Sequence, residues 1–181
     1  MAFGREKRMT VVLIVLGSLV GLVVLMGLIG LVLPRGHVAT VSARLAAPSE
    51  RVWTVVRDFP GYADWQPGVR KVERLPDQEG LRCWRLHRRG PPITFVVAED
   101  SPPGLLVTHI ADKRLPFGGS WVYEVKQDGD GTALSVTERG EIYNPVFRFL
   151  ARFVFGYYGA LEQFVGGLAK QLGETVTLER K

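Results

Sequence analysis

Apolar and polar residues alternate through most of the chain after residue 36. Because alternate residues of a strand point to opposite faces of a sheet, this pattern indicates half-buried β-strands. Clusters rich in Gly and Pro separate the alternating segments, as in "PDQEG", "RGPP", "DSPPG" and "QDGDG", and such clusters favour turns. The pattern predicts an antiparallel meander with strands at 37–45, 69–75, 81–88, 93–99, 105–111, 120–126 and 132–142.

Two segments have apolar residues at helical spacing instead. In "PSERVWTVVRDF", Pro48 suits a first helical turn, and the apolar side chains fill one side. A longer helix is predicted from Asn144-Pro145 onward, with an apolar stripe at Phe149, Phe153, Tyr157, Leu161, Phe164, Leu168 and Leu172. Only the sheet is large enough to cover this stripe. The chain is therefore predicted to be α+β, with a curved antiparallel sheet of about seven strands around a long C-terminal helix.

The segment before the alternating region differs from both patterns. From Thr10 to Leu33 the sequence contains no charged residue, and Pro34-Arg35 follows it. At about 1.5 Å per residue a helix over this segment reaches roughly 36 Å, more than the hydrocarbon core of a bilayer at about 30 Å. A cleavable signal peptide has a shorter apolar core, of about 7 to 15 residues, and a small-residue cleavage site after it. We therefore predict one uncleaved transmembrane helix over residues 10–33.

Charge around this segment predicts its orientation. Arg5, Lys7 and Arg8 precede it, whereas Arg35 alone follows it closely. By the positive-inside rule, the N-terminus is expected in the cytoplasm and the domain after the span on the outer side of the membrane. The predicted organisation is a basic tail (1–9), the transmembrane helix (10–33), a juncture (34–36), one domain (37–175) and a C-terminal tail (176–181).

The net charge of the chain comes mainly from the region of the membrane segment. The formal charge is +5, with 23 basic and 18 acidic residues. Removing four basic residues (Arg5, Lys7, Arg8 and Arg35) and one acidic residue (Glu6) leaves 19 basic and 17 acidic residues. The remaining basic run, "RLHRRG", lacks the interleaved aromatic residues of a nucleic-acid surface, so no nucleic-acid partner is predicted. The single cysteine, Cys83, excludes a disulfide within the chain and is expected to pack as a small apolar residue.

Three stretches resemble the polyketide cyclase/dehydrase and lipid-transport family of the START-like, or SRPBCC, helix-grip superfamily. They are "APSERVWTVVRDFPGYADWQPGVRKVE", "PFGGSWVYEV" and "GTALSVTERGEIYNPVFRFLARFVFG". With the strand order, the resemblance covers about residues 38–173, and the N-terminal membrane segment is not part of it. It implies a hydrophobic cavity between the sheet and the C-terminal helix, which in relatives holds lipids, polyketides or isoprenoid molecules. Because this fold supports many chemistries, the resemblance implies a pocket more than a reaction.

Strand parity identifies candidate cavity residues. Glu124 and Lys126 share one parity and are expected to face water, which turns Trp121 and Tyr123 inward. Leu134 and Val136 share the parity of Glu138, so this carboxylate is expected on the concave side, near the mouth. Aromatic bodies with polar tips suit an apolar ligand that carries one or two oxygens. Core packing explains the aromatic residues equally well, and a structural ion pair or an exposed strand end explains Glu138.

Further candidates come from the helices and one loop. Trp65 follows the first helices, where relatives have their entrance, so it suits either closing over a ligand or packing under the loop 60–67. Phe153 and Tyr157 belong to the stripe of the long helix. Phe117, Gly118 and Gly119 are expected to form a flexible loop tip that gates the cavity, although glycine pairs are also common in ordinary turns. The aromatic start of the long helix, "FRFLARFVFGYY", suits either a sheet-facing stripe or a membrane interface.

These patterns leave three functional hypotheses open. The preferred one is membrane-anchored binding or transfer of a hydrophobic small molecule or lipid. The second is a cyclase, dehydratase or hydrolase in the same cavity, with Glu138, His109 or Arg85 as acid/base groups. The third is an interaction module whose own side chains fill the cavity. His37, His87 and His109 lie on separate predicted strands with no metal-ligand spacing, so neither a metal nor another cofactor is predicted.

Overall fold

The computed structural model describes residues 2–181, with side chains described from residue 8 onward. The predicted basic tail, 1–9, therefore lies largely outside the described side chains. The described chain divides into two compact units. The anchor unit contains the residues up to Arg35 together with Ile142–Gly156, and the sheet unit contains Gly36–Glu141 together with Tyr157–Lys181. Residues 142–156, which the sequence analysis places within one domain at 37–175, thus group with the N-terminal helix.

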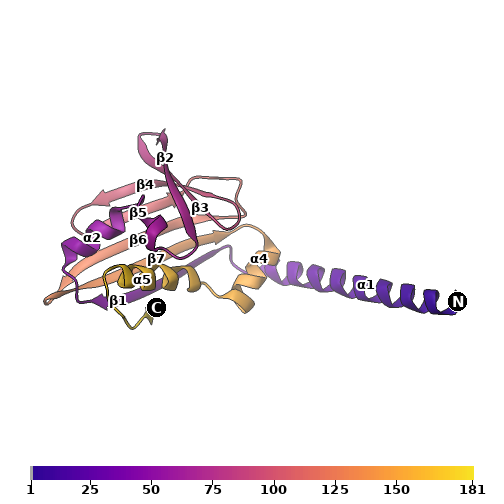
Figure 1. The fold of residues 1–181 in the computed structure, drawn as a ribbon. Helices are drawn as coiled ribbons and strands as arrows, with labels where there is room; N and C mark the ends of the chain where they lie inside the picture. Colours follow the sequence, from indigo (N-terminus) through magenta and orange to yellow (C-terminus); the bar gives the residue numbers. More distant parts are fainter. Residues whose placement is uncertain (1) are drawn as a thin grey trace. The chain divides into compact units, whose positions relative to one another are not determined.

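The sheet unit is built on one antiparallel sheet (Figure 1). Its strand order is β2-β3-β4-β5-β6-β7-β1-β8, so that the first strand lies beside the seventh. The strands span Gly36–Leu45 (β1), Val69–Gln78 (β2), Leu81–Arg88 (β3), Ile93–Ser101 (β4), Leu105–Ile110 (β5), Phe117–Asp128 (β6), Gly131–Ile142 (β7) and Glu179–Arg180 (β8). The seven longer strands confirm the predicted meander. β8 is a two-residue addition from the predicted tail that pairs with β1 at Val41 and Ser42.

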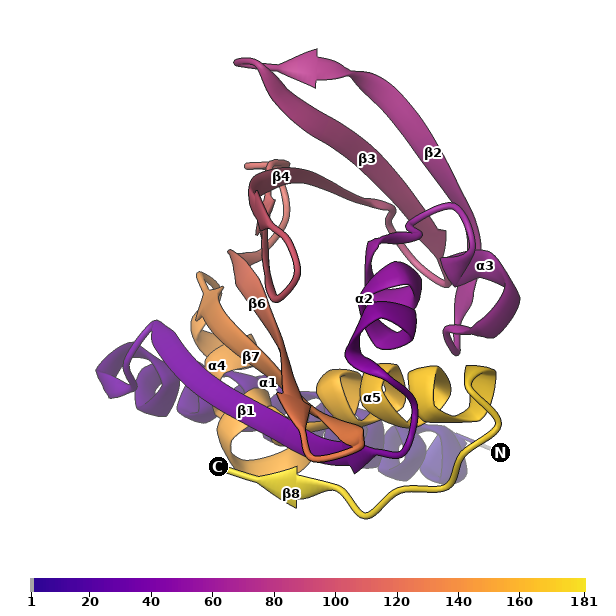
Figure 2. The same cartoon turned by 90° about the vertical axis from the view of Figure 1, so that its left-hand side faces the viewer.

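Three helices cover one face of this sheet (Figure 2). They are α2 (Ser49–Arg57), α3 (Tyr62–Trp65) and α5 (Gly159–Gln171). Helical spacing on α5 turns Leu161, Phe164 and Leu168 toward the sheet, and all three are completely buried. Opposite them, strand alternation buries Val41 of β1 and Val136 of β7. The result is the predicted α+β helix-grip architecture with a single apolar core in the sheet unit.

The C-terminal helix is interrupted, which the apolar stripe did not predict. Pro145–Leu150 form α4, Ala151–Phe155 form one π-helical turn, and the chain then breaks before α5 begins. Gly156 ends the first piece at φ 71° and ψ −176°, a positive-φ conformation that is open essentially to glycine alone. Because a π turn holds more residues than an α turn, it also rotates the residues after it out of phase with α4. Phe153, within this turn, is 60% exposed and does not belong to a continuous buried stripe.

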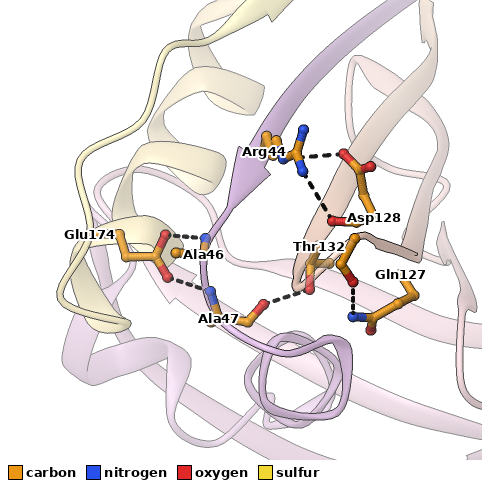
Figure 3. A network of polar contacts seen from close by, with 8 residues as sticks. Arg44, Ala46, Ala47, Gln127, Asp128, Thr132 and Glu174 are labelled. Atoms are coloured by element: carbon orange, nitrogen blue, oxygen red, sulfur yellow. Dashed lines mark hydrogen bonds and ion pairs between the residues drawn. The ribbon is translucent and has the colours of Figure 1, made fainter.

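A polar clamp fixes the chain after α5 to the end of β1 (Figure 3). The carboxylate of Glu174 accepts hydrogen bonds from the backbone N–H groups of Ala46 and Ala47, at 2.7 and 2.8 Å. The hydroxyl of Thr132 donates to the carbonyl of Ala47 at 2.7 Å. These bonds satisfy backbone groups at the β1–α2 corner, where the sheet ladder has ended. They hold α5 over the sheet and therefore position the cavity described below.

The anchor unit is helical. Its first helix, α1, spans Ala2–Val32, and Arg8–Val32 is long and apolar enough to cross a membrane by length and composition. The described side chains of this stretch are almost all exposed to the surroundings. The short helix α4 lies beside the C-terminal end of α1 (Figure 1). An added Cβ at Gly30 would come 1.9 Å from the carbonyl oxygen of Pro145, so only glycine permits this contact.

Candidate functional site

A cavity of about 270 Å³ lies within the sheet unit. Its walls come from the concave face of the sheet, from the loop that follows α3 and from the first turns of α5. It is lined by Phe59, Tyr62, Gln66, Pro67, Gly68, Val69, Leu86, Arg88, Arg89, Ile93, Phe95, Thr108, Ile110, Phe117, Trp121, Tyr123, Glu138, Ala160 and Gln163. Most of these side chains are apolar or aromatic, as in sites that bind small organic molecules.

Strand alternation on β6 builds one wall. Phe117, Trp121 and Tyr123 share a parity and all line the cavity, whereas Glu124 and Lys126 form an ion pair at 3.0 Å that is largely exposed. The predicted parity of this strand is therefore confirmed. The rings of Trp121 and Tyr123 pack on Phe164 of α5 at centroid distances of 5.9 and 5.2 Å. This helix thus fixes the aromatic wall in place from the side of the core.

Glu138 is the acidic residue in the cavity lining. As predicted from its parity with Leu134 and Val136, it lies on the concave side of β7. Its neighbour is a histidine from another strand, which no local pattern predicted: Nε2 of His37 lies 3.7 Å from Oε1 of Glu138. Antiparallel pairing of β1 with β7 sets Ala39 opposite Glu138 and His37 opposite Gly140, which makes the two side chains diagonal neighbours.

Gly140 makes room for this His37–Glu138 pair. A Cβ added to Gly140 would lie 2.2 Å from Cε1 of His37 and 3.1 Å from Oε1 of Glu138. The imidazole therefore rests on bare backbone, and on one side it stacks on the ring of Tyr157, with centroids 4.1 Å apart. Nδ1 of His37 is buried and has no hydrogen-bond partner among the described residues. The pair is thus held in place by ring stacking and backbone shape more than by hydrogen bonds.

Two hydroxyl groups add polarity inside the cavity. Burial raises the pKa of Tyr123 far above its ordinary value, a hydrogen bond with Thr108 opposes this rise, and the charge of Glu138 adds to it. The phenol therefore stays protonated at neutral pH and remains a hydrogen-bond donor. Burial likewise raises the pKa of Tyr62, whose hydroxyl donates to the carbonyl oxygen of Val56. Both tyrosines are neutral polar groups in an apolar wall.

The mouth of the cavity is polar. Arg88, Arg89 and Gln163 line it and are exposed, so their side chains meet both the cavity and the solvent. Gln66 also lines the cavity, and its Oε1 is buried without a hydrogen-bond partner among the described residues. Buried acceptors of this kind are normally satisfied in native proteins. The lining therefore contains two guanidinium groups and a glutamine whose buried oxygen has no partner among the described residues.

Not every predicted site residue lies in this lining. Trp65 packs edge-on against Phe164 and Tyr62, with centroids 5.2 and 5.0 Å apart, and fills the space between α3 and α5. Tyr157 covers His37. Phe153 belongs to the anchor unit because the π turn and Gly156 separate it from α5.

The predicted loop tip at Phe117, Gly118 and Gly119 is not a loop in the structure. All three residues lie within β6 and not in a loop tip. Gly119 has φ 118°, and an added Cβ would lie 2.2 Å from the carbonyl oxygen of Arg139, so this glycine permits close packing of β6 on β7. Phe117 itself lines the cavity. Gly119 therefore serves strand packing at this edge of the cavity.

Of the three candidate acid/base groups, only Glu138 lines the cavity. His109 is exposed and Arg85 contacts Thr94, and neither lines the cavity, whereas Glu138 does. Residues that sequence reasoning missed come mainly from β3, β4, β5 and the loop after α3, including Gln66, Arg88 and Thr108. The inward parity of Leu106, Thr108 and Ile110 was a readable signal for Thr108. Arg88 likewise shares the parity of Leu86 on β3, whereas no local pattern marks Gln66, because its place depends on how the loop after α3 packs against the sheet.

A second hollow, of about 460 Å³, lies elsewhere on the sheet unit. Its lining includes Arg44, Glu124, Lys126, Asp128 and Glu179. Among these, Arg44 pairs with Asp128 at 3.3 Å and Lys126 with Glu124 at 3.0 Å. These charged groups thus pair with one another in a largely solvated setting, and the lining has no aromatic wall for an apolar ligand. The first cavity is the better candidate despite its smaller volume.

A curved sheet, helices on its concave face and an apolar cavity between them define a helix-grip protein of the START-like class. The sequence matches the family described as polyketide cyclase / dehydrase and lipid transport over residues 36–173. The chain belongs to this family, which confirms the resemblance. No match was found among curated proteins.

Solved structures agree on the fold. The Zhui aromatase/cyclase from Streptomyces sp. R1128 is similar with a TM-score of 0.61 at 20% identity, covering 76% of this chain and 94% of that one. A START superfamily protein from Mycobacterium smegmatis has a TM-score of 0.57 at 21% identity, with coverages of 76% and 97%. Truncated norcoclaurine synthase from Thalictrum flavum has a TM-score of 0.60 at 14% identity, with coverages of 77% and 95%. At these identities the similarity establishes the fold alone.

Proposed function

We propose that this protein binds a hydrophobic small molecule or lipid in its cavity while α1 anchors it in a membrane. The observation that carries the proposal is the cavity itself, an aromatic-walled space of about 270 Å³ with polar groups at defined points. A protein whose own side chains filled this space would have no such volume, so the interaction-module hypothesis is disfavoured. The family's description, which includes lipid transport, agrees with this reading.

The lining suggests the chemical class of the ligand. Binding sites for drug-sized molecules usually have about 300–1,000 Å³, so a cavity near the lower limit suits one ring system or part of an acyl chain. Phe95, Trp121 and Tyr123 offer an apolar surface to such a body. At the mouth, Arg88 and Arg89 would favour an anionic or strongly polar head group. We therefore propose an amphipathic ligand with its apolar part inside.

The membrane anchor would serve ligand capture. A tether raises the effective concentration of a binding site near its source, and only residues 33–35 separate α1 from β1. A cavity kept beside a bilayer would exchange apolar ligands without long passage through water. The excess of Arg and Lys before the uncharged residues 10–33 leads us to propose a cytoplasmic N-terminus with the sheet unit on the outer side.

A second candidate function is a cyclase-like or dehydratase-like reaction in the same cavity. The observation in its favour is the His37–Glu138 pair, at 3.7 Å, next to a protonated Tyr123. Such groups are suited to transferring protons to and from a bound carbonyl compound. Two of the similar structures are named as an aromatase/cyclase and a synthase. Turnover of an offered polyketide-like substrate, lost in His37→Ala, would favour this reaction over carriage alone.

Binding can be tested with the full chain in phosphatidylcholine nanodiscs and 1-anilinonaphthalene-8-sulfonate, an aromatic anion, as the probe. We expect saturable binding that Ala160→Trp abolishes, because Ala160 lines the cavity. Ala98→Trp, at an exposed position of β4 outside the lining, is the matched control and should bind as the unchanged protein does. Equal binding by both variants would place the probe elsewhere and contradict the proposal.

The role of Glu138 has a separate test. Glu138→Gln keeps the size of the side chain and removes its charge. If Glu138 meets the polar part of the ligand, the affinity for co-purifying lipid should change by about tenfold to a hundredfold, as expected for one charged hydrogen bond of roughly 1.5–3 kcal/mol. Native mass spectrometry of the full chain would identify that lipid and measure its occupancy. Unaltered affinity would remove Glu138 from the site.

A further inference from the structure

Exposed large apolar side chains are concentrated in one short segment of the described chain. Beyond α1, six such residues are exposed, and five of them lie between residues 143 and 155. Phe153, Val154 and Phe155 are 60%, 62% and 71% exposed. Tyr143 and Phe147 are 43% and 48% exposed. Contiguous exposed apolar surface of this kind usually marks a binding surface or a membrane contact.

This segment is firmly attached to the C-terminal end of α1. At Gly30 the backbone of α1 touches Pro145 so closely that no Cβ fits between them. The side chain of Arg148 is only 5% exposed, and its Nη1 donates to the carbonyl oxygen of Leu33 at 2.9 Å. Its positive charge thus meets the negative end of the α1 dipole. The exposed aromatic residues are therefore held at a fixed level beside the end of the apolar helix.

That level corresponds to the boundary of a bilayer that α1 crosses. Leu28, Leu31 and Val32 of α1 are 58%, 61% and 84% exposed, so the apolar surface of the helix continues to its last residue. The 25 residues of Arg8–Val32 reach roughly 37 Å, somewhat longer than the hydrocarbon core of about 30 Å. The C-terminal turns of α1, and the segment packed on them, would accordingly lie at the head groups.

The composition of the segment fits this boundary. Aromatic side chains are enriched at the interface between lipid and water, and an exposed Arg152 can meet anionic head groups. Backbone polar groups are also provided for: Oδ1 of Asn144 accepts hydrogen bonds from the N–H groups of Val146 and Phe147, at 2.9 and 3.2 Å. This cap matters more beside lipid than in water, because lipid offers no alternative partners.

We infer that residues 143–155 form an interfacial membrane element that inserts its aromatic side chains among the lipid head groups beside α1. The inference rests on the proposed membrane anchoring. We assign the bilayer as the partner of this segment because the segment packs on α1, whose apolar side chains are exposed up to its last residue. The anchor is then a composite of two segments that are more than a hundred residues apart in sequence. Phe153 thereby has a role in membrane contact and not in the cavity.

The test uses the full chain with Cys83→Ala, reconstituted in phosphatidylcholine vesicles, and one introduced cysteine that carries a fluorescent label. Labels at Phe153 and Phe155 should be quenched by lipids that carry a nitroxide near the head group, and less by lipids labelled at the chain end. An interfacial helix lies only about 5–10 Å deep, which explains this order. A label at Ala98, exposed on β4 of the sheet unit, should escape quenching.

A label at Leu22 of α1 separates the two proposals. If lipid quenches the Leu22 label but not the labels at Phe153 and Phe155, the anchor stands and the interfacial element is wrong. If none of the labels is quenched, both proposals fail. If the labels at Phe153 and Phe155 become protected only as the protein density in the vesicles rises, the segment contacts a second copy, and the inference is again overturned. Unchanged tryptophan emission of each variant, relative to the unlabelled protein, verifies that it is folded.

Discussion

The two pieces of the C-terminal helical region make opposite use of their aromatic residues. On α5, Phe164 is completely buried and touches the rings of Tyr62, Trp65, Trp121 and Tyr123. On the piece before it, Phe153 and Phe155 are 60% and 71% exposed. In the sequence, both pieces belong to one continuous apolar stripe, which predicted a single helix. The difference shows that an apolar stripe predicts burial but does not identify the partner that buries it. The sheet covers α5, and we propose that lipid covers the segment before it.

The largest expected effect in this comparison comes from removing the buried ring. Phe164→Ala should lower the free energy of unfolding of the sheet unit by about 3–5 kcal/mol, because it removes contact area and leaves a cavity. Phe155→Ala, the matched change on the exposed piece, should alter it by about 0.5 kcal/mol or less. Thermal unfolding of the full chain in nanodiscs, followed by tryptophan emission, measures both. Similar losses for the two variants would break the comparison.

A smaller effect is expected where the exposed piece is attached. Gly30→Ala places a methyl group against the backbone of Pro145 and should weaken the contact between α1 and α4 by about 1–3 kcal/mol. Gly17→Ala, where the added methyl group meets nothing, should only improve helix propensity, by roughly 1 kcal/mol. Hydrogen exchange of residues 143–155 in nanodiscs reports the difference. Equal protection in both variants would argue against close packing at Gly30.

The smallest expected effect is the pH dependence of stability that comes from the buried phenol of Tyr123. Because the folded-state pKa of Tyr123 is raised, its neutral form stabilises the fold fully below the unfolded pKa of about 10, and this stability is lost as pH rises further toward the folded pKa. Above about pH 10 the loss from this residue should approach roughly 1.4 kcal/mol per pH unit. Tyr123→Phe removes this contribution, so urea unfolding at successive pH values should show a shallower alkaline decline. An identical slope in the variant would mean that the phenol ionises freely in the folded protein.

Much of the fold could be read from local patterns. Alternation predicted seven strands and the inward parity of Trp121, Tyr123 and Glu138, because a strand has only two faces. The interruption after Phe155 could not be read in the same way, since a glycine within an apolar stripe is compatible with a continuous helix. The partner of Glu138 could not be predicted from local patterns either. His37 is about a hundred residues away, and only the pairing of β1 with β7 brings them together.

The sequence by itself determined the element types, the family and a helix able to cross a membrane, because hydrophobic period and segment length are properties of neighbouring residues. Tertiary structure alone decided which side chains enclose the cavity, that Gly119 and Gly140 serve close packing, and that residues 142–156 join the N-terminal helix. These outcomes depend on sheet curvature, strand register and helix breaks. Each of them arises from contacts between residues far apart in the chain, which no local pattern records.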